Sequence, residues 1–552
     1  MRFPALLLAL LAVSAAPAGA QARAAQRRFE DERRAWLPVR GGREGECDAR
    51  IGRFCYWADT VPDPVVPESP RIVKARDRLL GELAQAQAAK PGDEWITGQR
   101  VRYLLDAGRV DSAVLVARRC RTGWWCAALE GLALHSAERW LDADSAFSRA
   151  MRSMTDKQRC EWVDMEPLLD GELRARWRRS DCAGRSRLAE WEWWRSTPAL
   201  GHEGNDLRAE YFARRTLMQL WEGTATPHGV AFGADLRELM LRYGVPAWYS
   251  RTIAPPGALS EPAVIGHDHA PSFAWLATDS APERLVDAAR DDVHARGVAA
   301  RARYAPPYAA QFREIDAQVG AFRRGDSMRV VMAYTLADTL RGATAVEAVL
   351  AVSPGPGSVT RVRSANAAWV GVMTATSPAV PTLASLELTR ADSAGFARAR
   401  EVVSPGWLGA GRLAVSSLML FAVRRGEEIA TLEDATRVAM PSLRLVRAGS
   451  VGLFWETYGV AASGEELSLS LTVEPIAVGA VRRVRERLHL ATVAPTLAIK
   501  WTDRPVTPGG EAPRAVSVDL GSLPGGHYRL SLVVSAATGE SSVAYREIEI
   551  VR

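Results

Sequence analysis

Residues 124–154 read WWCAALEGLALHSAERWLDADSAFSRAMRSM, and the order of small and large apolar residues in this stretch decides the fold of the N-terminal part of the chain. Apolar residues recur at intervals of three and four, which predicts two consecutive helices. Gly131 and Ala143 are small enough to let these helices approach closely. Phe147 is then expected to fill the groove between them.

The same positions have the spacing of a tetratricopeptide repeat. They are Gly131, Leu134, Ala143, Phe147 and Ala150, and a weaker match precedes them at Leu104, Gly108, Ala113 and Ala117. Further helices are predicted over residues 71–90, 93–108 and 110–120, where Pro-Gly or Gly follows the periodic segment. We therefore expect a helical repeat region over residues 70–200, with generic helical hairpins as the alternative.

Six cysteines, all in the first third of the chain, indicate disulfide bonds. An even number is typical of exported proteins, although six cysteines allow 15 pairings. Pairing of sequence neighbours gives Cys47–Cys55, Cys120–Cys126 and Cys160–Cys182. The stretch CRTGWWC at 120–126 has the spacing of neither a redox centre nor a zinc site, so we expect it to clamp the turn between two helical pairs.

The first twenty residues have the pattern of a secretory signal peptide. Arg2 precedes an apolar run from Phe3 to Val13, and Ala-Gly-Ala at 18–20 fits a cleavage site. The run is too short for the alternative, a membrane anchor, and no later stretch predicts a membrane span. We expect cleavage after Ala20 and export to the periplasm or the extracellular space.

The charge of the chain argues against nucleic-acid binding. The 70 basic and 64 acidic residues are interleaved and leave a formal charge of +6. A nucleic-acid-binding protein would concentrate its basic residues on one face.

From about residue 310 the pattern becomes alternating. Residues 327–336 and 344–353 are rich in β-branched residues and are bounded by turn formers, which is typical of antiparallel sandwiches. A second set of such segments begins near residue 448 and includes LPGGHYRLSLVV at 523–534. Neither set contains cysteine, so each module is expected to depend on its own core. On the alternating pattern, Glu456 should face solvent, away from Trp455.

These patterns predict a multidomain α+β protein. The expected order is a signal peptide (1–20), an irregular arm (21–69), the helical repeat region (70–200), a further segment (201–255), a linker (256–310), a first β-sandwich (311–425), a connecting segment (426–447) and a second β-sandwich (448–552). The arm is expected to be irregular because VPDPVVPESP, at 61–70, contains four prolines.

Three stretches add a family resemblance. GNDLRAEYFARR (204–215), ADLRELMLRYGVP (234–246), and the two C-terminal strands VGLFWETYGV (451–460) and LPGGHYRLSLVV together resemble exported bacterial proteins that carry a GWxTD domain behind tetratricopeptide helices. The motif Gly-Trp-x-Thr-Asp, which gives this family its name, is absent from this sequence, and HGVAFGAD (228–235) stands at its position. The resemblance implies a fold and a compartment, and it implies no particular chemistry.

Tryptophans are frequent between residues 160 and 225. They are Trp162, Trp177, Trp191, Trp193, Trp194 and Trp221. Such clusters can stack on sugars or peptides, but more often they fill contacts between helices, and we expect the second role here.

The candidate metal ligands are three histidines. His267 and His269 would share one face of a strand, and His202, followed by Glu203, could supply a third ligand. The simpler interpretation is a polar loop whose histidines bond to the backbone. We therefore predict no metal site, no cofactor and no catalytic residue.

The expected function is that of an exported, non-catalytic scaffold or binding protein. Helical repeats carry concave surfaces that bind peptides or partner proteins. An unidentified protein or peptide partner is therefore expected, with an envelope-associated complex as one form of the interaction. The alternative is a hydrolase of cell-envelope polymers, for which the three histidines would be the candidate metal ligands.

Overall fold

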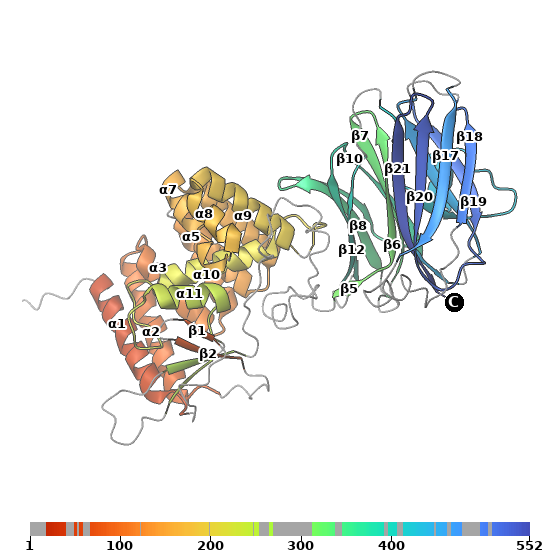
Figure 1. Cartoon of the computed structure of the whole chain (residues 1–552). Coiled ribbons are helices and arrows are strands. Elements are labelled where there is room, and N and C mark those ends of the chain that lie inside the picture. The colour runs from red at the N-terminus through yellow and green to blue at the C-terminus, as the bar shows by residue number, and fades with distance from the viewer. Residues whose placement is uncertain are drawn as a thin grey trace, which may run out of the picture. The chain divides into compact units, whose positions relative to one another are not determined.

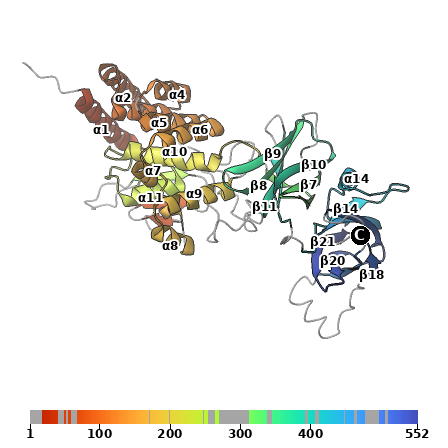
Figure 2. The same ribbon diagram turned by 90° about the horizontal axis from the view of Figure 1, so that it is seen from above.

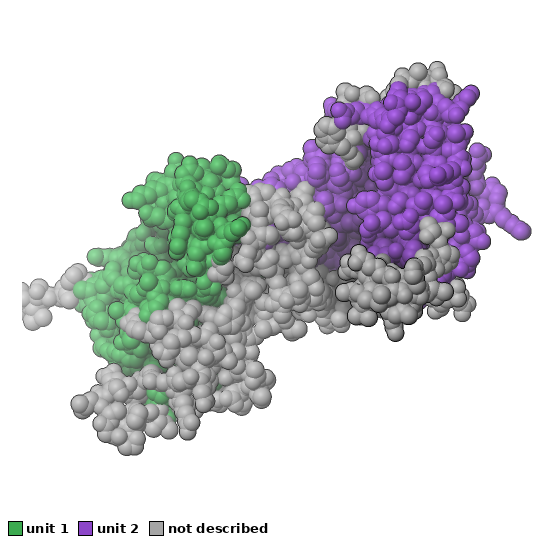
Figure 3. All heavy atoms as spheres, in the orientation of Figure 1, with its two compact units in different colours: residues 1–189, 204–279, 296–304 green, residues 190–203, 280–295, 305–552 purple. Residues whose placement is uncertain are grey.

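The computed structural model describes residues 18–39, 49–51, 54–58, 67–252, 264–268 and 312–551, with internal gaps at 122, 170, 198, 247, 337–339, 341–344, 391–395, 406–411, 447–448, 461–464, 477–496 and 506–509. The chain forms two compact units, which Figure 3 distinguishes by colour. Residues 1–189, 204–279 and 296–304 make the first, here called the helical unit. Residues 190–203, 280–295 and 305–552 make the second, the β unit.

Most helices belong to the helical unit (Figure 1). They are α1 (Ala18–Trp36), α2 (Pro70–Ala89), α3 (Glu94–Asp106), α4 (Val110–Arg119), α5 (Gly123–Ser136), α6 (Trp140–Ser153), α7 (Asp156–Trp162), the 3-10 helix η1 (Glu166–Leu168), α8 (Gly171–Arg179), α9 (Cys182–Ser196), α10 (Asp206–Trp221) and α11 (Ala234–Tyr243). Each helix from α1 to α6 contacts the next one along the chain. Among the described residues, no helix combines the length and the apolar character needed to cross a bilayer.

The predicted packing of α5 on α6 is confirmed. A Cβ atom added to Gly131 would lie 2.6 Å from a ring carbon of Phe147, so only glycine allows this approach. Ala143 and Phe147 are fully buried. In the preceding pair of helices, Ala113 and Ala117 are buried in the same way.

Helix α10 covers the face that α3, α5 and α6 share, as Figures 1 and 2 show. Twelve of its 16 residues are buried. A Cβ atom on Gly98 of α3 would lie 2.6 Å from Leu220 of α10, so the two helices are in close contact. Helix α10 thus covers a face that α3, α5 and α6 would otherwise leave open.

The prediction of an irregular arm over residues 21–69 was wrong for its first part. Helix α1 buries Ala22, Ala25 and Phe29 at helical spacing, but polar residues with partners inside the protein separate them and hide the pattern. Cleavage after Ala20 would remove only the first three residues of this helix. The remainder of the predicted signal peptide, residues 1–17, lies outside the described part of the chain.

A small sheet also crosses the expected boundaries. Its strands are β1 (Ala49–Ile51), β2 (Phe54–Ala58), β3 (Trp248–Arg251) and β4 (Val264–Asp268), in the order β1-β2-β4-β3. Strands β1 and β2 come from the predicted arm, and β4 comes from the predicted linker. Pairing between segments 200 residues apart leaves no local sequence signal.

The β unit contains two sandwiches, as predicted, but the expected end of the first at residue 425 was wrong, because Ala414–Val415 and Met419–Ala422 pair with a strand of the second. The first has the sheets β10-β7-β6 and β5-β12-β11-β8-β9. The second has the sheets β13-β16-β14, with β19 also paired to β16, and β15-β21-β20-β17-β18. These sheets, together with the helices of the first unit, confirm the multidomain α+β class.

The elements of the β unit have the following bounds. They are β5 (Phe312–Glu314), β6 (Ala317–Arg324), β7 (Ser327–Thr335), β8 (Val346–Gly355), β9 (Ser358–Ser364), β10 (Val370–Pro378), β11 (Thr382–Arg390), β12 (Phe396–Val403), β13 (Ala414–Val415), β14 (Met419–Ala422), α14 (Leu432–Arg437), β15 (Arg444–Val446), β16 (Ser450–Tyr458), β17 (Leu467–Pro475), β18 (Leu497–Asp503), β19 (Ala512–Asp519), β20 (Gly526–Ala536) and β21 (Ser541–Val551). Apart from the parallel pairs β5–β12 and β15–β21, neighbouring strands in these sheets run antiparallel.

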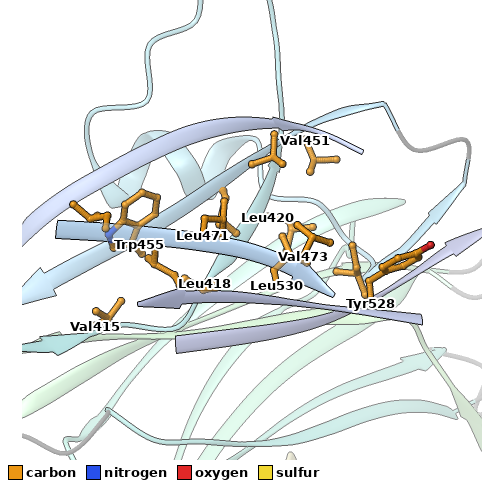
Figure 4. Close-up of a cluster of buried hydrophobic side chains, with 14 of the residues drawn as sticks. Val415, Leu418, Leu420, Val451, Trp455, Leu471, Val473, Tyr528 and Leu530 are labelled. Atoms are coloured by element: carbon orange, nitrogen blue, oxygen red, sulfur yellow. The ribbon is translucent and has the colours of Figure 1, made fainter. Parts of the chain in front are cut away.

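The two sandwiches do not depend on separate cores alone. One apolar cluster lies inside the first sandwich, and another, drawn in Figure 4, lies inside the second. A third cluster is shared, because Phe322 and Val331 of the first sandwich contact Phe421 and Phe454 of the second. The connecting segment contributes to it through Leu432 of α14.

Glu456 lies in this shared region, so the prediction that it faces solvent was wrong. Its carboxylate is 2% exposed and accepts hydrogen bonds from Arg324 at 2.7 and 2.9 Å and from the Tyr458 hydroxyl at 2.7 Å. The side chain does point away from Trp455. However, the second face of strand β16 is covered by the first sandwich, which the alternating pattern alone does not reveal.

Residues 190–203, which include the end of α9, belong to the β unit. More than 100 residues separate them from β5, the first strand of that unit. The indole of Trp194 donates to Ser353 Oγ at 3.0 Å. The backbone N–H groups of Leu200 and Gly201 each donate to the buried carboxylate of Glu387 at 2.7 Å. The expected boundary at residue 311 therefore omits a segment that covers the sheet β5-β12-β11-β8-β9.

Replacement of Glu387 tests this attachment. We expect Glu387→Ala to lower the free energy of unfolding of the β unit by about 2–4 kcal/mol, because two buried N–H donors lose a charged acceptor. Differential scanning calorimetry of the full chain would measure the loss.

Glu347→Ala is the matched control on the same sheet. Its ion pair with Arg363 is exposed, so the cost should stay below about 1 kcal/mol. Equal costs for the two variants would contradict the attachment.

Candidate ligand-binding cavity

A cavity of about 400 Å³ opens on the helical unit. Its walls combine aromatic, aliphatic and planar polar side chains from α5, α7, α10, α11 and the residues just before α11. The lining residues are Trp124, Gln158, Glu161, Trp162, Arg215, Met218, Gln219, Glu222, Phe232 and Arg237. The volume lies in the range of about 300–1,000 Å³ that is usual for small-molecule sites.

Two predicted disulfides hold two of these walls. Cys120–Cys126 closes the turn from α4 to α5 and fixes the first turn of α5, which carries Trp124. Cys160–Cys182 ties α7, the helix that carries Trp162, to α9. The third predicted pair, Cys47–Cys55, lies outside the described side chains.

The aromatic wall has a buried layer and an accessible one. The ring of Trp162 is 4% exposed, stacks on Phe212 with an interplanar angle of 9°, and lies at 5.1 Å from Trp124 in an edge-to-face contact. Trp124 itself is half-buried. Trp162 therefore supports Trp124, and Trp124 offers its ring to the cavity.

The lining of the cavity contains as many acidic as basic side chains. Arg237 pairs with Glu222 at 3.1 Å. Arg215 places its guanidinium 5.7 Å from the Trp162 ring and donates from Nη2 to the backbone oxygen of Glu161 at 2.6 Å. Its Nε is buried and has no hydrogen-bond partner among the described residues. The two arginines and two glutamates give the lining no net charge.

This site was not predicted from the sequence. Trp162, which was expected in a contact between helices, also lines the cavity, and Trp124 belongs to the stretch CRTGWWC, which was expected only to clamp a turn. The prediction of helix contacts was wrong for Trp194, which packs on strands of the β unit. The residues that α10 contributes were missed. Their spacing, at 215, 218, 219 and 222, marks one face of a helix, but nothing in the sequence shows what this face meets.

Of the three candidate metal ligands, the structure describes only the side chain of His202. His202 belongs to the β unit, where its backbone oxygen accepts from Arg361 at 3.0 Å. His267 lies on β4 of the helical unit. The side chain of His267 and all of His269 lie outside the described residues. Within the described ranges, no group of three His, Cys, Asp or Glu residues is placed to hold a metal ion.

A second cluster of titratable groups lies between α1, α2 and α3. Glu30 is fully buried, accepts from the Tyr103 hydroxyl at 2.6 Å and lies 3.2 Å from Arg102. Burial raises the pKa of its carboxyl, against the effect of Arg33 and Arg102. Arg33 also donates to Asp106 at 2.9 Å. The members of this cluster bind one another, and we infer that these contacts hold α1 against α3.

A buried carboxylate attaches α10 to α5. Glu210 of α10 lies 2.8 Å from Nε2 of His135 and 2.6 Å from Nε of Arg214. Burial alone would raise the pKa of Glu210, but Arg214 and His135 lower it to about 2. The ionised carboxylate therefore stabilises the fold.

This shift predicts an acid-sensitive attachment. The pKa of Glu210 lies below its unfolded value of 4.5, so its contribution is complete above pH 4.5 and is lost as the pH falls towards 2. We expect Glu210→Gln to cost about 2–3 kcal/mol at pH 7 and progressively less below pH 4.5. Urea unfolding of the helical unit at several pH values would measure this.

Glu238→Gln is the control, because Glu238 forms the same (i, i+4) pair with Arg242 but is 40% exposed. Its cost should stay below about 0.5 kcal/mol at every pH. A pH dependence as steep as that of Glu210→Gln would refute the assignment.

The disulfide at α7 should contribute more to the free energy of unfolding than the disulfide at α5. Loop closure predicts a loss of about 3 kcal/mol for Cys160→Ser with Cys182→Ser, and of about 2 kcal/mol for Cys120→Ser with Cys126→Ser, because 22 residues separate the first pair and six the second. Urea unfolding of the two double variants would give the order. The reverse order would indicate that strain, and not chain entropy, sets the stabilities.

Comparison with known proteins gives no family for this chain. No family model and no curated protein matches it. Among solved structures, red sea bream transglutaminase is similar over 43% of this chain and 31% of its own, with 7% identity and a TM-score of 0.15. The FN1–FN3 domains of chicken CNTN1 are similar over 44% of this chain and 68% of their own, with 9% identity and a TM-score of 0.16.

The chain spans about a third of the length of that transglutaminase. Similarities at these scores support no conclusion about activity. The class that the coordinates define is a multidomain α+β protein with a disulfide-bonded helical unit and two joined β-sandwiches.

Proposed function

We propose that this protein is an exported, non-catalytic binding protein or scaffold whose ligand occupies the cavity beside Trp124. The observation that carries the proposal is the half-buried Trp124 ring, which lines the cavity and packs edge-to-face on Trp162, whose ring lies 5.7 Å from the Arg215 guanidinium. A rigid aromatic surface beside hydrogen-bonding groups is the usual composition of a binding site.

The rigidity of the cavity favours binding. Disulfides hold the helices that carry Trp124 and Trp162, and the Glu210 ion pairs hold α10, which supplies Arg215. A site that is already ordered loses little conformational freedom when a ligand enters. The same features give a reason for the disulfides at these two turns.

Export is proposed from the N-terminal sequence pattern, and the disulfides are compatible with it, because disulfides persist in oxidising compartments. The β unit would serve as a spacer or as a further interaction surface. Its two sandwiches share a core, so they would present their surfaces in a fixed relation. The resemblance to GWxTD-domain proteins also implies export, and membership of that family is part of this proposal.

Replacement of the accessible ring tests the function. The wild-type protein, Trp124→Ala and the control Trp36→Ala would be immobilised and exposed to an envelope extract of the producing organism. Trp36 is also exposed, at 41%, but it lies on α1 and stacks with Arg71 away from the cavity. We expect a ligand that the wild type and the control retain and that Trp124→Ala loses.

Identical retention by the three proteins would contradict binding at the cavity. Breakdown of the retained ligand during incubation would favour the hydrolase alternative.

A further inference from the structure

We infer that the ligand of this cavity is an uncharged saccharide, an inference that rests on the proposed function and names its ligand class. The lining has two kinds of side chain. Four are apolar, namely Trp124, Trp162, Met218 and Phe232. The other six are all amides, carboxylates or guanidinium groups, namely Gln158, Glu161, Arg215, Gln219, Glu222 and Arg237.

A sugar ring has the matching distribution of surface. One face of a pyranose consists of C–H groups, which lie against an aromatic ring, and its rim consists of hydroxyls, which both donate and accept hydrogen bonds. Planar groups with two polar atoms can bond to two neighbouring hydroxyls at once. A lining that is part aromatic and part planar-polar therefore fits an amphipathic ring better than it fits a purely apolar ligand.

The balance of charge selects an uncharged ligand. Arg237 is already paired with Glu222, and Arg215 already donates to the backbone oxygen of Glu161. A polyanion or a polycation would meet one repelling group for each attracting one and would gain little net electrostatic energy. Hydroxyl groups can bond to either sign and leave these pairs intact.

Two glutamines provide groups for such bonds. Gln219 is exposed on the cavity side of α10. The Oε1 atom of Gln158 is used in the helix cap, where it accepts from the backbone N–H of Thr155 at 2.9 Å. This bond fixes the orientation of the amide, so its NH2 group is left to donate to a ligand.

The experiment measures direct binding to the full mature chain. Isothermal titration calorimetry would use four neutral oligosaccharides (cellohexaose, maltohexaose, xylohexaose and the hexamer of N-acetylglucosamine), the anionic hexamer of galacturonic acid, and a mixture of tripeptides. We expect at least one neutral oligosaccharide to bind, with an affinity that changes little with salt. Trp124→Ala should weaken this binding at least about tenfold, through loss of the stacked ring.

Two further variants separate loss of recognition from loss of fold. Gln219→Leu keeps the size of an exposed side chain but removes its hydrogen bonds, so it should weaken saccharide binding while the unfolding temperature stays the same. Trp36→Ala should bind as the wild type does. A weakening by Trp36→Ala equal to that by Trp124→Ala would overturn the inference.

The other outcomes distinguish this inference from the proposed function. Binding of tripeptides but of no saccharide, with loss in Trp124→Ala, would overturn the saccharide and leave the binding function in place. Tighter binding of the galacturonic acid hexamer than of every neutral oligosaccharide would overturn the requirement for an uncharged ligand. Absence of any Trp124-dependent binding, in this assay and in the envelope extract, would overturn both.

Discussion

The burial of helix α10 is the constraint on which the helical unit depends. Twelve of its 16 residues are buried, and it contacts α3, α5 and α6, so these three helices need it to cover their common face. An isolated array of helical hairpins would expose this face as a groove. Here the chain covers this face with its own later segment, and the cavity lies at the C-terminal end of α10, between α10, α5 and α7.

Buried charge accompanies this arrangement and has a consistent pattern. Glu210 receives two cationic or protonatable neighbours, and the carboxylates near α1 are faced by arginines. In the β unit, Glu456 and Glu387 are held in the same way by donors from distant segments. Removing one member of such a group leaves its partner buried without compensation, which is why ionic contacts at these positions specify a single arrangement.

The sequence revealed those parts of the fold that depend on nearby residues. Gly131 and Phe147 lie 16 positions apart, and the pattern of small and large residues around them predicted their contact correctly. Cys120 and Cys126 paired as neighbours for the same reason. Helix α1 was missed because Gln26, Glu30 and Arg33 occupy buried positions that are normally apolar. Their partners lie on other helices, so no local pattern marks them as buried.

The candidate cavity was not predicted from the sequence. Trp162 was expected to fill a contact between helices, and Arg215 and Gln219 become lining residues only when α10 lies against α5 and α7. Glu456 is a similar case. The alternating pattern predicted correctly that its side chain points away from Trp455, but it could not show that the other sandwich covers that side of the strand. Long-range packing, and not local propensity, decides these positions.

The attachment of residues 190–203 to the β unit affects the order in which the protein can form during its synthesis. The N–H groups of Leu200 and Gly201 bind Glu387, so 186 residues must be added to the growing chain after Gly201 before this contact can exist. Until then Trp194 and Leu200 have no sheet to cover. A ribosome adds about 5–20 residues per second, so the segment waits for roughly 10–40 s with apolar side chains uncovered. During this interval, these uncovered apolar side chains are exposed to chaperones that bind nascent chains.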